Sequence, residues 1–292
     1  MIKVSKGEKI FNVFNIILMI IIMIITIYPI LHVLFASVSD SNLLLAHRGL
    51  LLKPIGFNLE AYKMVFKNPM IVRGYFNTIF VVVVGVIVNI IMTSLAAYVL
   101  SRKDVLWKNS MMFFIVFTMF FSGGLIPFYF TVKSLHIDNT YLALILPVAI
   151  NTFNLIIMRT SFAAIPDSLE ESAKLDGASH FTILFRIILP LSLPIVAVMV
   201  LYYSVAHWNA WFNAMIFIQD RNLYPLQLVL REILIQNDTA SMSTGVGAGD
   251  QEAIGESIKY AVIVVATLPI LCVYPFLQKY FTKGALVGAV KG

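Results

Sequence analysis

Charged side chains are scarce in this chain of 292 residues. Only 12% of the residues are Asp, Glu, Lys or Arg, whereas 60% are hydrophobic. Because a soluble domain carries about 25% charged residues, this sequence has about half the charge needed to cover a globular surface. The composition therefore excludes an ordinary soluble domain and indicates a membrane protein.

Motifs for nucleotide, metal or redox chemistry are also missing. The sequence has no GxxxxGK stretch followed by Ser or Thr, no HExxH and no CxxC, and its five histidines are scattered. Its single cysteine, Cys272, lies in an apolar run and cannot form an internal disulfide. We therefore expect no catalytic residue, metal site or cofactor site in this chain. The positions of the charges favour membrane topology over a nucleic-acid partner.

Six uncharged runs are each long enough to cross a bilayer, which takes about 20 apolar residues. These runs predict an all-α integral membrane protein with about six transmembrane helices, forming one transmembrane domain over residues 1–292. The spans are expected near residues 11–39, 74–101, 109–132, 139–158, 191–219 and 260–278.

The basic residues predict the orientation of these spans. Arg102, Lys103 and Lys108 lie in one short loop, and the short loop on the opposite side has only Lys133. Because cytoplasmic loops carry an excess of Lys and Arg, the loop with three basic residues is expected inside. Both termini are then cytoplasmic.

A long loop between the fourth and fifth spans has the signals of two short helices. Asp167 or Ser168 is a candidate N-cap for the first helix. Glu170 or Glu171, three residues further on, would complete a capping box. This segment, residues 165–190, is expected on the cytoplasmic side.

The second half of this loop begins with a glycine. Gly177 lies where a helix ends with a positive φ, and Ser179 can cap a second helix. That helix would carry an apolar stripe with i, i+3, i+4, i+7 spacing. Either a groove in a partner protein or the ends of the chain's own helices would cover the stripe. Its members are Phe181, Leu184, Phe185 and Ile188.

The loop also resembles the cytoplasmic loop by which ABC importer permeases dock into their ATPase subunit. The matching residues are Glu171-Ser172-Ala173-Lys174-Leu175-Asp176-Gly177-Ala178 and Ile187-Ile188-Leu189-Pro190. Ser172 replaces the usual second Ala of that pattern, a small-for-small change. The resemblance implies that ATPase coupling involves Glu170, Glu171, Ala173, Asp176, Gly177, Ala178, Phe181, Phe185, Leu189 and Pro190.

Other stretches resemble the sugar-importing branch of the same permeases. They are residues 121–129, 204–214, 223–234 and the C-terminal tail, 278–292. The resemblance implies a bacterial cytoplasmic-membrane subunit that passes an oligosaccharide or polysaccharide fragment. Its implied partners are a second homologous permease, an extracytoplasmic solute-binding protein and two ATPase subunits that hold ATP and Mg.

Two other classes of transporter are alternatives. An ABC permease for an amino acid or a peptide would share the loop, although the sugar-type tail argues against it. An ion-coupled secondary transporter would need an acidic residue within the membrane. The six runs contain no Asp, Glu, Lys or Arg, which argues against that class.

Aromatic and amide side chains in the fourth and fifth spans are candidates for lining a sugar path, because sugars offer apolar ring faces and many hydroxyls. Ser204, Trp208 and Trp211 would share a helical face by their i, i+4, i+7 spacing. Interfacial anchoring and hydrogen bonding between helices are the alternative roles. The candidates are Asn151, Asn154, Tyr203, His207, Trp208, Trp211 and Asn213.

Overall fold

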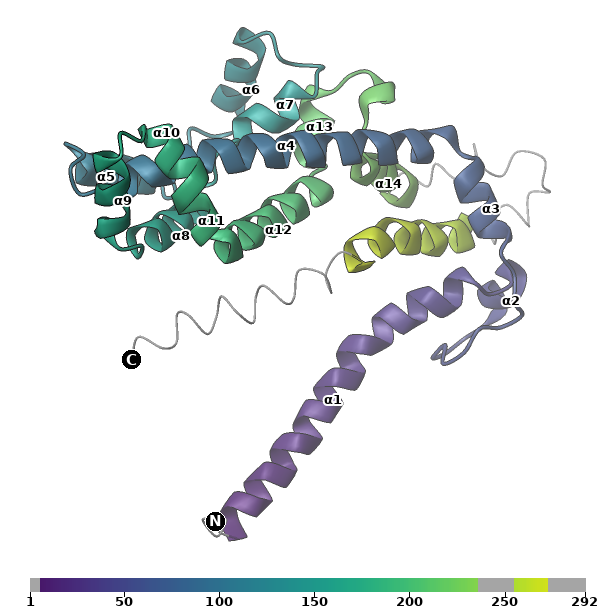
Figure 1. The fold of residues 1–292 in the computed structure, drawn as a ribbon. Coiled ribbons are helices and arrows are strands. Elements are labelled where there is room, and N and C mark those ends of the chain that lie inside the picture. Colours follow the sequence, from purple (N-terminus) through teal and green to yellow (C-terminus); the bar gives the residue numbers. More distant parts are fainter. Residues whose placement is uncertain (1–5, 236–254, 273–292) are drawn as a thin grey trace. The chain divides into compact units, whose positions relative to one another are not determined.

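The computed structural model describes residues 6–235 and 255–272, and this part of the chain is built from helices (Figure 1). An isolated antiparallel bridge joins Ser39 to Phe57. The expected all-α class is confirmed. The predicted cytoplasmic tail, 279–292, and the end of the last expected span lie outside the described residues.

The chain divides into two compact units. The first comprises residues 1–69 and 232–268, and the second comprises residues 70–231 and 269–292. The helices of the first unit are α1 (Lys6–Ser37), α2 (Ser41–Ala46), α3 (Glu60–Lys67) and most of a helix over Gly255–Cys272.

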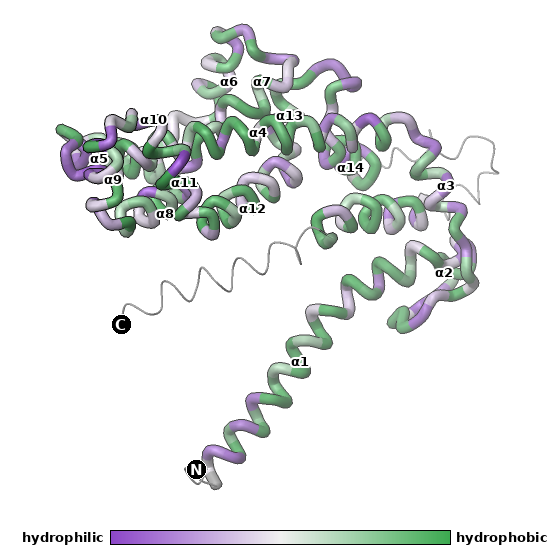
Figure 2. Tube along the Cα trace, in the orientation of Figure 1, coloured by the Kyte–Doolittle hydropathy of each residue, from purple (hydrophilic) through white to green (hydrophobic). Residues whose placement is uncertain are grey.

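Helix α1 is apolar along most of its length, as the green tube in Figure 2 shows. None of its most apolar stretch is buried within the chain. The segment that follows is held by polar contacts with the end of α1. Tyr28 accepts a hydrogen bond from the backbone N–H of Leu51, and the hydroxyls of Ser37 and Tyr62 lie 2.7 Å apart. The exposed face of α1 is therefore suited to lipid or to another membrane chain.

The second unit is organised along one long helix, α4 (Pro69–Ser101). Figure 1 shows α5, α8, α9 and α10 gathered at one end of α4. The remaining elements are α5 (Lys108–Phe117), α6 (Leu125–Ser134), α7 (Leu142–Ile145), η1 (Leu146–Val148), α8 (Thr152–Ala163), α9 (Asp167–Leu175), α10 (His180–Ile183), η2 (Leu184–Ile188), α11 (Leu189–Leu191), α12 (Leu193–Asn209), α13 (Phe212–Phe217), η3 (Arg221–Leu223) and α14 (Leu226–Ile235).

Three described helices are long and apolar enough to cross a membrane: Gly7–Ser37, Pro69–Ser101 and Gly255–Cys272. Two further spans would be bent pairs. Helices Leu142–Val148 and Thr152–Ala163 meet at 51°, and His180–Leu191 and Leu193–Asn209 meet at 88°. The described part of the chain thus supplies three to five candidate spans, and the expected total of six remains a prediction.

Three expected spans differ from the helices that the structure contains. The 51° bend between η1 and α8 interrupts residues 139–158. Residues 109–132 form α5 and α6 with a break between them, where Gly124 has a φ of 83°. Residues 191–219 form α12 and α13, because the extended backbone of Ala210 ends α12. The sequence analysis predicted continuous helices here because it used only the length of the apolar runs. The length of an apolar run does not show where the backbone leaves the helical conformation.

The core of the second unit lies where α4 meets α8, α12 and the loop after α8. Small and aromatic residues of α4 pack against large side chains of the other helices. The loop helices join this core through Ala173, Ile183 and Ile188, so the loop packs as part of the bundle. The central residues are Ala97, Tyr98, Leu155, Met158, Phe162, Met199 and Tyr203.

Candidate functional site

A cavity of about 170 Å³ lies within the second unit, at the break between η1 and α8. Among the residues that the structure describes, no charged side chain lines it. Its apolar wall includes Val81 and Leu144, and its polar wall is made by Thr78, Asn151, Asn154, Tyr203, His207 and Asn213. Five of the seven residues expected along a sugar path therefore meet at one cavity.

The helix break at this cavity is stabilised by hydrogen bonds from α4. The fully buried amide of Asn89 donates to the carbonyls of Val148 and Ala149, at 2.6 and 2.9 Å. Asn151 caps α8 by accepting a hydrogen bond from the N–H of Asn154 at 3.1 Å. Backbone groups freed within a membrane must find such partners. Sequence reasoning missed Asn89, although an amide in the middle of an apolar run was its signal.

Two of the lining residues also hold the helices together. His207 Nε2 lies 2.7 Å from Asn89 Oδ1, and the hydroxyl of Tyr203 lies 2.8 Å from that of Thr93. The Tyr203 hydroxyl also accepts a hydrogen bond from the backbone N–H of Asn151 at 3.1 Å. The cavity wall is thus a connected polar network with a defined geometry.

The side-chain amide of Asn154 differs from these groups. Asn154 is only 6% exposed and lies in the cavity wall. Among the described residues, no hydrogen-bond partner is found for its side-chain amide, whose nitrogen and oxygen can each bond a hydroxyl. Asn154 is therefore a lining residue whose amide is available to a molecule inside the cavity.

The two tryptophans expected on the path do not line this cavity. Helix α12 ends at Asn209, so the i, i+4, i+7 face predicted for Trp208 and Trp211 does not exist. The Trp208 ring lies 6.2 Å from that of Tyr75, and the guanidinium of Arg231 lies 4.7 Å from the Trp211 ring centroid. The prediction of a shared helical face was wrong because the backbone turns at Ala210, and neither indole lines the cavity.

A glycine permits the close contact between α4 and α12. A Cβ atom at Gly85 would lie 2.5 Å from Nε2 of His207, which is shorter than any normal contact. The absence of a side chain at residue 85 therefore makes room for the imidazole and for its hydrogen bond to Asn89.

The loop expected to contact an ATPase folds as the two predicted short helices, α9 and α10. Gly177 has a φ of 80°. The N–H of Gly177 donates to the carbonyl of Lys174 at 3.0 Å, and that of Ala178 donates to Ala173 at 2.9 Å. This is the Schellman pattern of a glycine-terminated helix. Ser179 accepts a hydrogen bond from the N–H of Thr182, so the predicted turn and second cap are confirmed.

The predicted capping box at the start of α9 was wrong. Pro166 occupies the N-cap position, and no side chain caps the helix. Asp167 instead forms an ion pair with Lys103 at 2.6 Å, and Glu170 points into the protein. A capping box is read from local spacing, whereas residues distant in the sequence attract both carboxylates.

The apolar stripe of the loop separates into buried and exposed members. Leu184 and Ile188 are buried, whereas Phe181 and Phe185 are 66% and 48% exposed. Of the other residues expected to couple to an ATPase, Glu170 and Ala173 are buried and Ala178 and Leu189 are half-buried. The exposed ones are Glu171, Asp176, Gly177 and Pro190.

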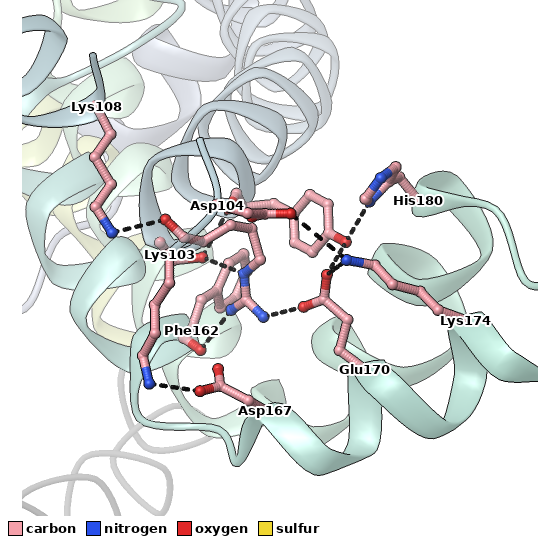
Figure 3. A network of polar contacts seen from close by, with 11 residues as sticks. Lys103, Asp104, Lys108, Phe162, Asp167, Glu170, Lys174 and His180 are labelled. Carbon is pink, nitrogen blue, oxygen red and sulfur yellow. Dashed lines mark hydrogen bonds and ion pairs between the residues drawn. The ribbon is translucent and has the colours of Figure 1, made fainter. Parts of the chain in front are cut away.

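Figure 3 shows a polar network under this loop that includes Glu170, Lys174 and His180. Arg102, directly after α4, bonds several members of this network. Arg102 is 6% exposed, and its guanidinium forms an ion pair with Glu170 of α9. The same group donates to the carbonyl of Phe162 at 2.9 Å and to Ser101 at 3.0 Å, and it lies 5.2 Å from the Tyr98 ring centroid. Arg102 thereby joins the end of α4 to both α8 and α9.

Glu170 has further partners around its carboxylate. Lys174 lies 3.1 Å from it and also pairs with Asp104 at 3.7 Å. The Tyr98 hydroxyl donates to Glu170 at 3.2 Å and lies 3.0 Å from His180 Nδ1. Burial raises the pKa of Glu170, but hydrogen bonds from Arg102 and Lys174 outweigh it and hold the pKa below its usual range. Glu170 is therefore ionised at neutral pH.

Comparisons with known proteins agree with this architecture. The family model described as "Binding-protein-dependent transport system inner membrane component" matches residues 7–286. The permease protein YtcP of a Bacillus subtilis polygalacturonan/rhamnogalacturonan transport system is 45% identical over 269 residues, covering 90% of this chain and 92% of YtcP. Protein LplC of the same organism is 45% identical over 290 residues, covering 99% and 97%.

A solved structure is also similar over almost the whole chain. It belongs to a bacterial ABC transporter involved in the import of the acidic polysaccharide alginate. The TM-score is 0.87 at 30% sequence identity, covering 96% of this chain and all of the other. Fold and sequence together define a multi-pass permease of an ABC importer. The chain belongs to the family of inner-membrane components of binding-protein-dependent transport systems.

Proposed function

We propose that this permease passes an oligosaccharide or polysaccharide fragment across the bacterial cytoplasmic membrane. The observation that carries the proposal is the uncharged polar cavity at the break before α8. Hydroxyl, amide and imidazole groups there suit the hydroxyls of a sugar. The polygalacturonan and alginate systems of the similar proteins point to a chain of uronic acid residues.

The wall of the cavity assigns different roles to its members. Asn154 would bond sugar hydroxyls directly, because its amide is available. Tyr203 and His207 would present their remaining hydrogen-bonding capacity while the network through Thr93 and Asn89 fixes their positions. Asn151 and Asn213 complete the polar wall.

The energy for transport would come from partner subunits. Two ATPase subunits would bind ATP and Mg, and this chain would contact one of them through residues 165–190. Exposed Phe181 and Phe185, beside exposed Glu171, suit a groove in that partner. A second homologous permease and an extracytoplasmic solute-binding protein would complete the complex, with lipid along α1. Nucleotide can drive the bundle only through different contacts in its two states.

The experiment is uptake into proteoliposomes that contain the complete complex. Solute-binding protein would be added outside, and the tested solutes would be oligogalacturonides, alginate oligosaccharides, arabino-oligosaccharides, amino acids and short peptides. We expect uptake of a saccharide that requires internal ATP. ATP-dependent uptake of amino acids or peptides alone, or uptake driven by an ion gradient without ATP, would contradict the proposal.

The proposed topology is tested separately. Both termini and the 165–190 loop would be cytoplasmic, because the short loop that contains Arg102, Lys103 and Lys108 is rich in basic residues. Arg102 and Lys103 pair with Glu170 and Asp167 of the 165–190 loop, so the two loops lie on the same side. In intact cells carrying Cys272→Ser, a cysteine at residue 6 should resist an impermeant thiol reagent. Labelling of that cysteine from outside would contradict the orientation.

A further inference from the structure

The ion pair between Arg102 and Glu170 differs from an ordinary surface contact. Both side chains are 7% exposed, and both have additional partners. Removing one member of a buried pair leaves the other charge uncompensated, so the pair holds its two helices together. By contrast, Lys103 and Asp167 join the same two segments through side chains that are 81% and 50% exposed. Water and salt weaken such a pair.

The helices joined by Arg102 both lead to the cavity. Arg102 bonds the carbonyl of Phe162, at the end of α8, and Arg159 of α8 bonds the carbonyl of Leu100 at 2.9 Å. The end of α4 and the end of α8 are thus tied to each other. Through its ion pair with Glu170, Arg102 also connects α9 to the ends of α4 and α8.

The opposite parts of the same two helices form the cavity wall. Along α4, the distance from Arg102 to Asn89 is about 20 Å at 1.5 Å per residue. Along α8, Asn151 lies at the other end from Phe162, about 16 Å away. Asn89 bonds the backbone beside the break, and Asn151 lines the cavity. A displacement of α9 would therefore reach the cavity through two helices that are hydrogen-bonded to each other at the loop end and beside the cavity.

We propose that Arg102 is a positioning residue that transmits movement of the ATPase-facing loop to α4 and α8. Glu170 is its partner in the loop and faces inward, whereas Glu171 and Phe181 face outward. Tyr98 of α4 also connects α10 to these helices through its contact with His180. This inference rests on the proposed function and assigns the loop two sides: an outer side for the ATPase and an inner side for the transport helices.

The test measures ATP hydrolysis and saccharide uptake separately in the variant Arg102→Gln. The complete complex would be purified through a tag on the ATPase subunit and placed in proteoliposomes with oligogalacturonide as the probe. We expect assembly and ATP hydrolysis to persist, while the number of ATP molecules used per saccharide rises about tenfold. Glu170→Gln, which keeps the size of the side chain, should give the same change. Lys103→Gln is the matched control and should leave the ratio unchanged, because its ion pair is exposed.

A second measurement needs no transported sugar. Ala206 lines the cavity, and Ala206→Cys in a Cys272→Ser background reports on access to it. We expect ATP with vanadate to change the rate of maleimide labelling in the wild-type background but not in Arg102→Gln. If the wild-type complex responds to nucleotide but does not take up oligogalacturonide, the proposed saccharide is wrong and the coupling proposal is still tested.

Three results would overturn the proposal. One is a normal ratio of ATP to saccharide together with a normal labelling response in Arg102→Gln. Another is a proportional loss of hydrolysis and uptake in both Arg102→Gln and Glu170→Gln. The third is failure of both variants to assemble, because the pair would then act in folding alone. If only Arg102→Gln fails to assemble, Glu170→Gln decides by the same criteria.

Discussion

Replacing Gly85 by Ala tests how closely α4 and α12 are packed at the cavity. The new Cβ would lie 2.5 Å from Nε2 and 2.8 Å from Cε1 of His207. The imidazole must then move and lose its 2.7 Å contact with Asn89. Overpacking costs about 1–3 kcal/mol, and a lost hydrogen bond costs about 1 kcal/mol. Alanine returns about 1 kcal/mol in helix propensity. The net expectation is a loss of about 1–3 kcal/mol.

The assay is thermal unfolding of the purified complex in detergent. A loss of this size lowers the midpoint by roughly 2–10 °C. The effect should nearly vanish when Gly85→Ala is combined with His207→Ala, because the methyl group then enters vacated space. Gly7→Ala is the control, since no neighbouring atom lies within 4 Å of the added Cβ. An unchanged midpoint, or an equal loss with and without His207, would refute the proposed contact.

Three further perturbations test other parts of the structure. Gly177→Val should strain the turn by about 1–2 kcal/mol and reduce both ATP-driven uptake and its coupling to hydrolysis; wild-type values for both would contradict this role. Asn89→Leu should lower the unfolding midpoint by leaving two carbonyls unpaired, at about 1–3 kcal/mol each, and an unchanged midpoint would show that other donors replace it. The lowered pKa of Glu170 means that its stabilising charge is present above the ordinary value of 4.5 and is lost only as the pH falls through the lowered pKa. The difference in midpoint between wild type and Glu170→Gln should therefore stay constant from pH 8 to pH 5 and shrink below about pH 4.5, whereas a decline that begins near neutral pH would contradict the assignment.

Composition and local spacing were sufficient for the class of protein and for part of the loop. The uncharged runs predicted an all-α membrane chain because apolar segments of that length are stable only in hydrocarbon or a large core. The turn at Gly177 and the cap at Ser179 were predictable because each depends on residues within one helical turn. The family resemblance of the same loop pointed to the importer class, to which the whole-chain comparisons assign the protein.

Local spacing failed wherever distant residues decided the structure. Glu170 satisfied the pattern of a capping box, but Arg102, 68 positions earlier, attracts it inward. Trp208 and Trp211 satisfied a helical period that the backbone at Ala210 interrupts. The spacing of these residues indicates neither the ion pair with Arg102 nor the end of α12 at Ala210.

The cavity shows the same division between sequence and tertiary structure. The sequence alone selected Asn151, Asn154 and His207 as unusual polar groups in apolar runs, because such groups need partners within a membrane. It did not reveal that Asn89, 59 positions before Val148, bonds the broken backbone beside them. Only the packing of α4 against α8 and α12 brings these groups together, since their positions depend on side chains and backbone carbonyls from separate helices.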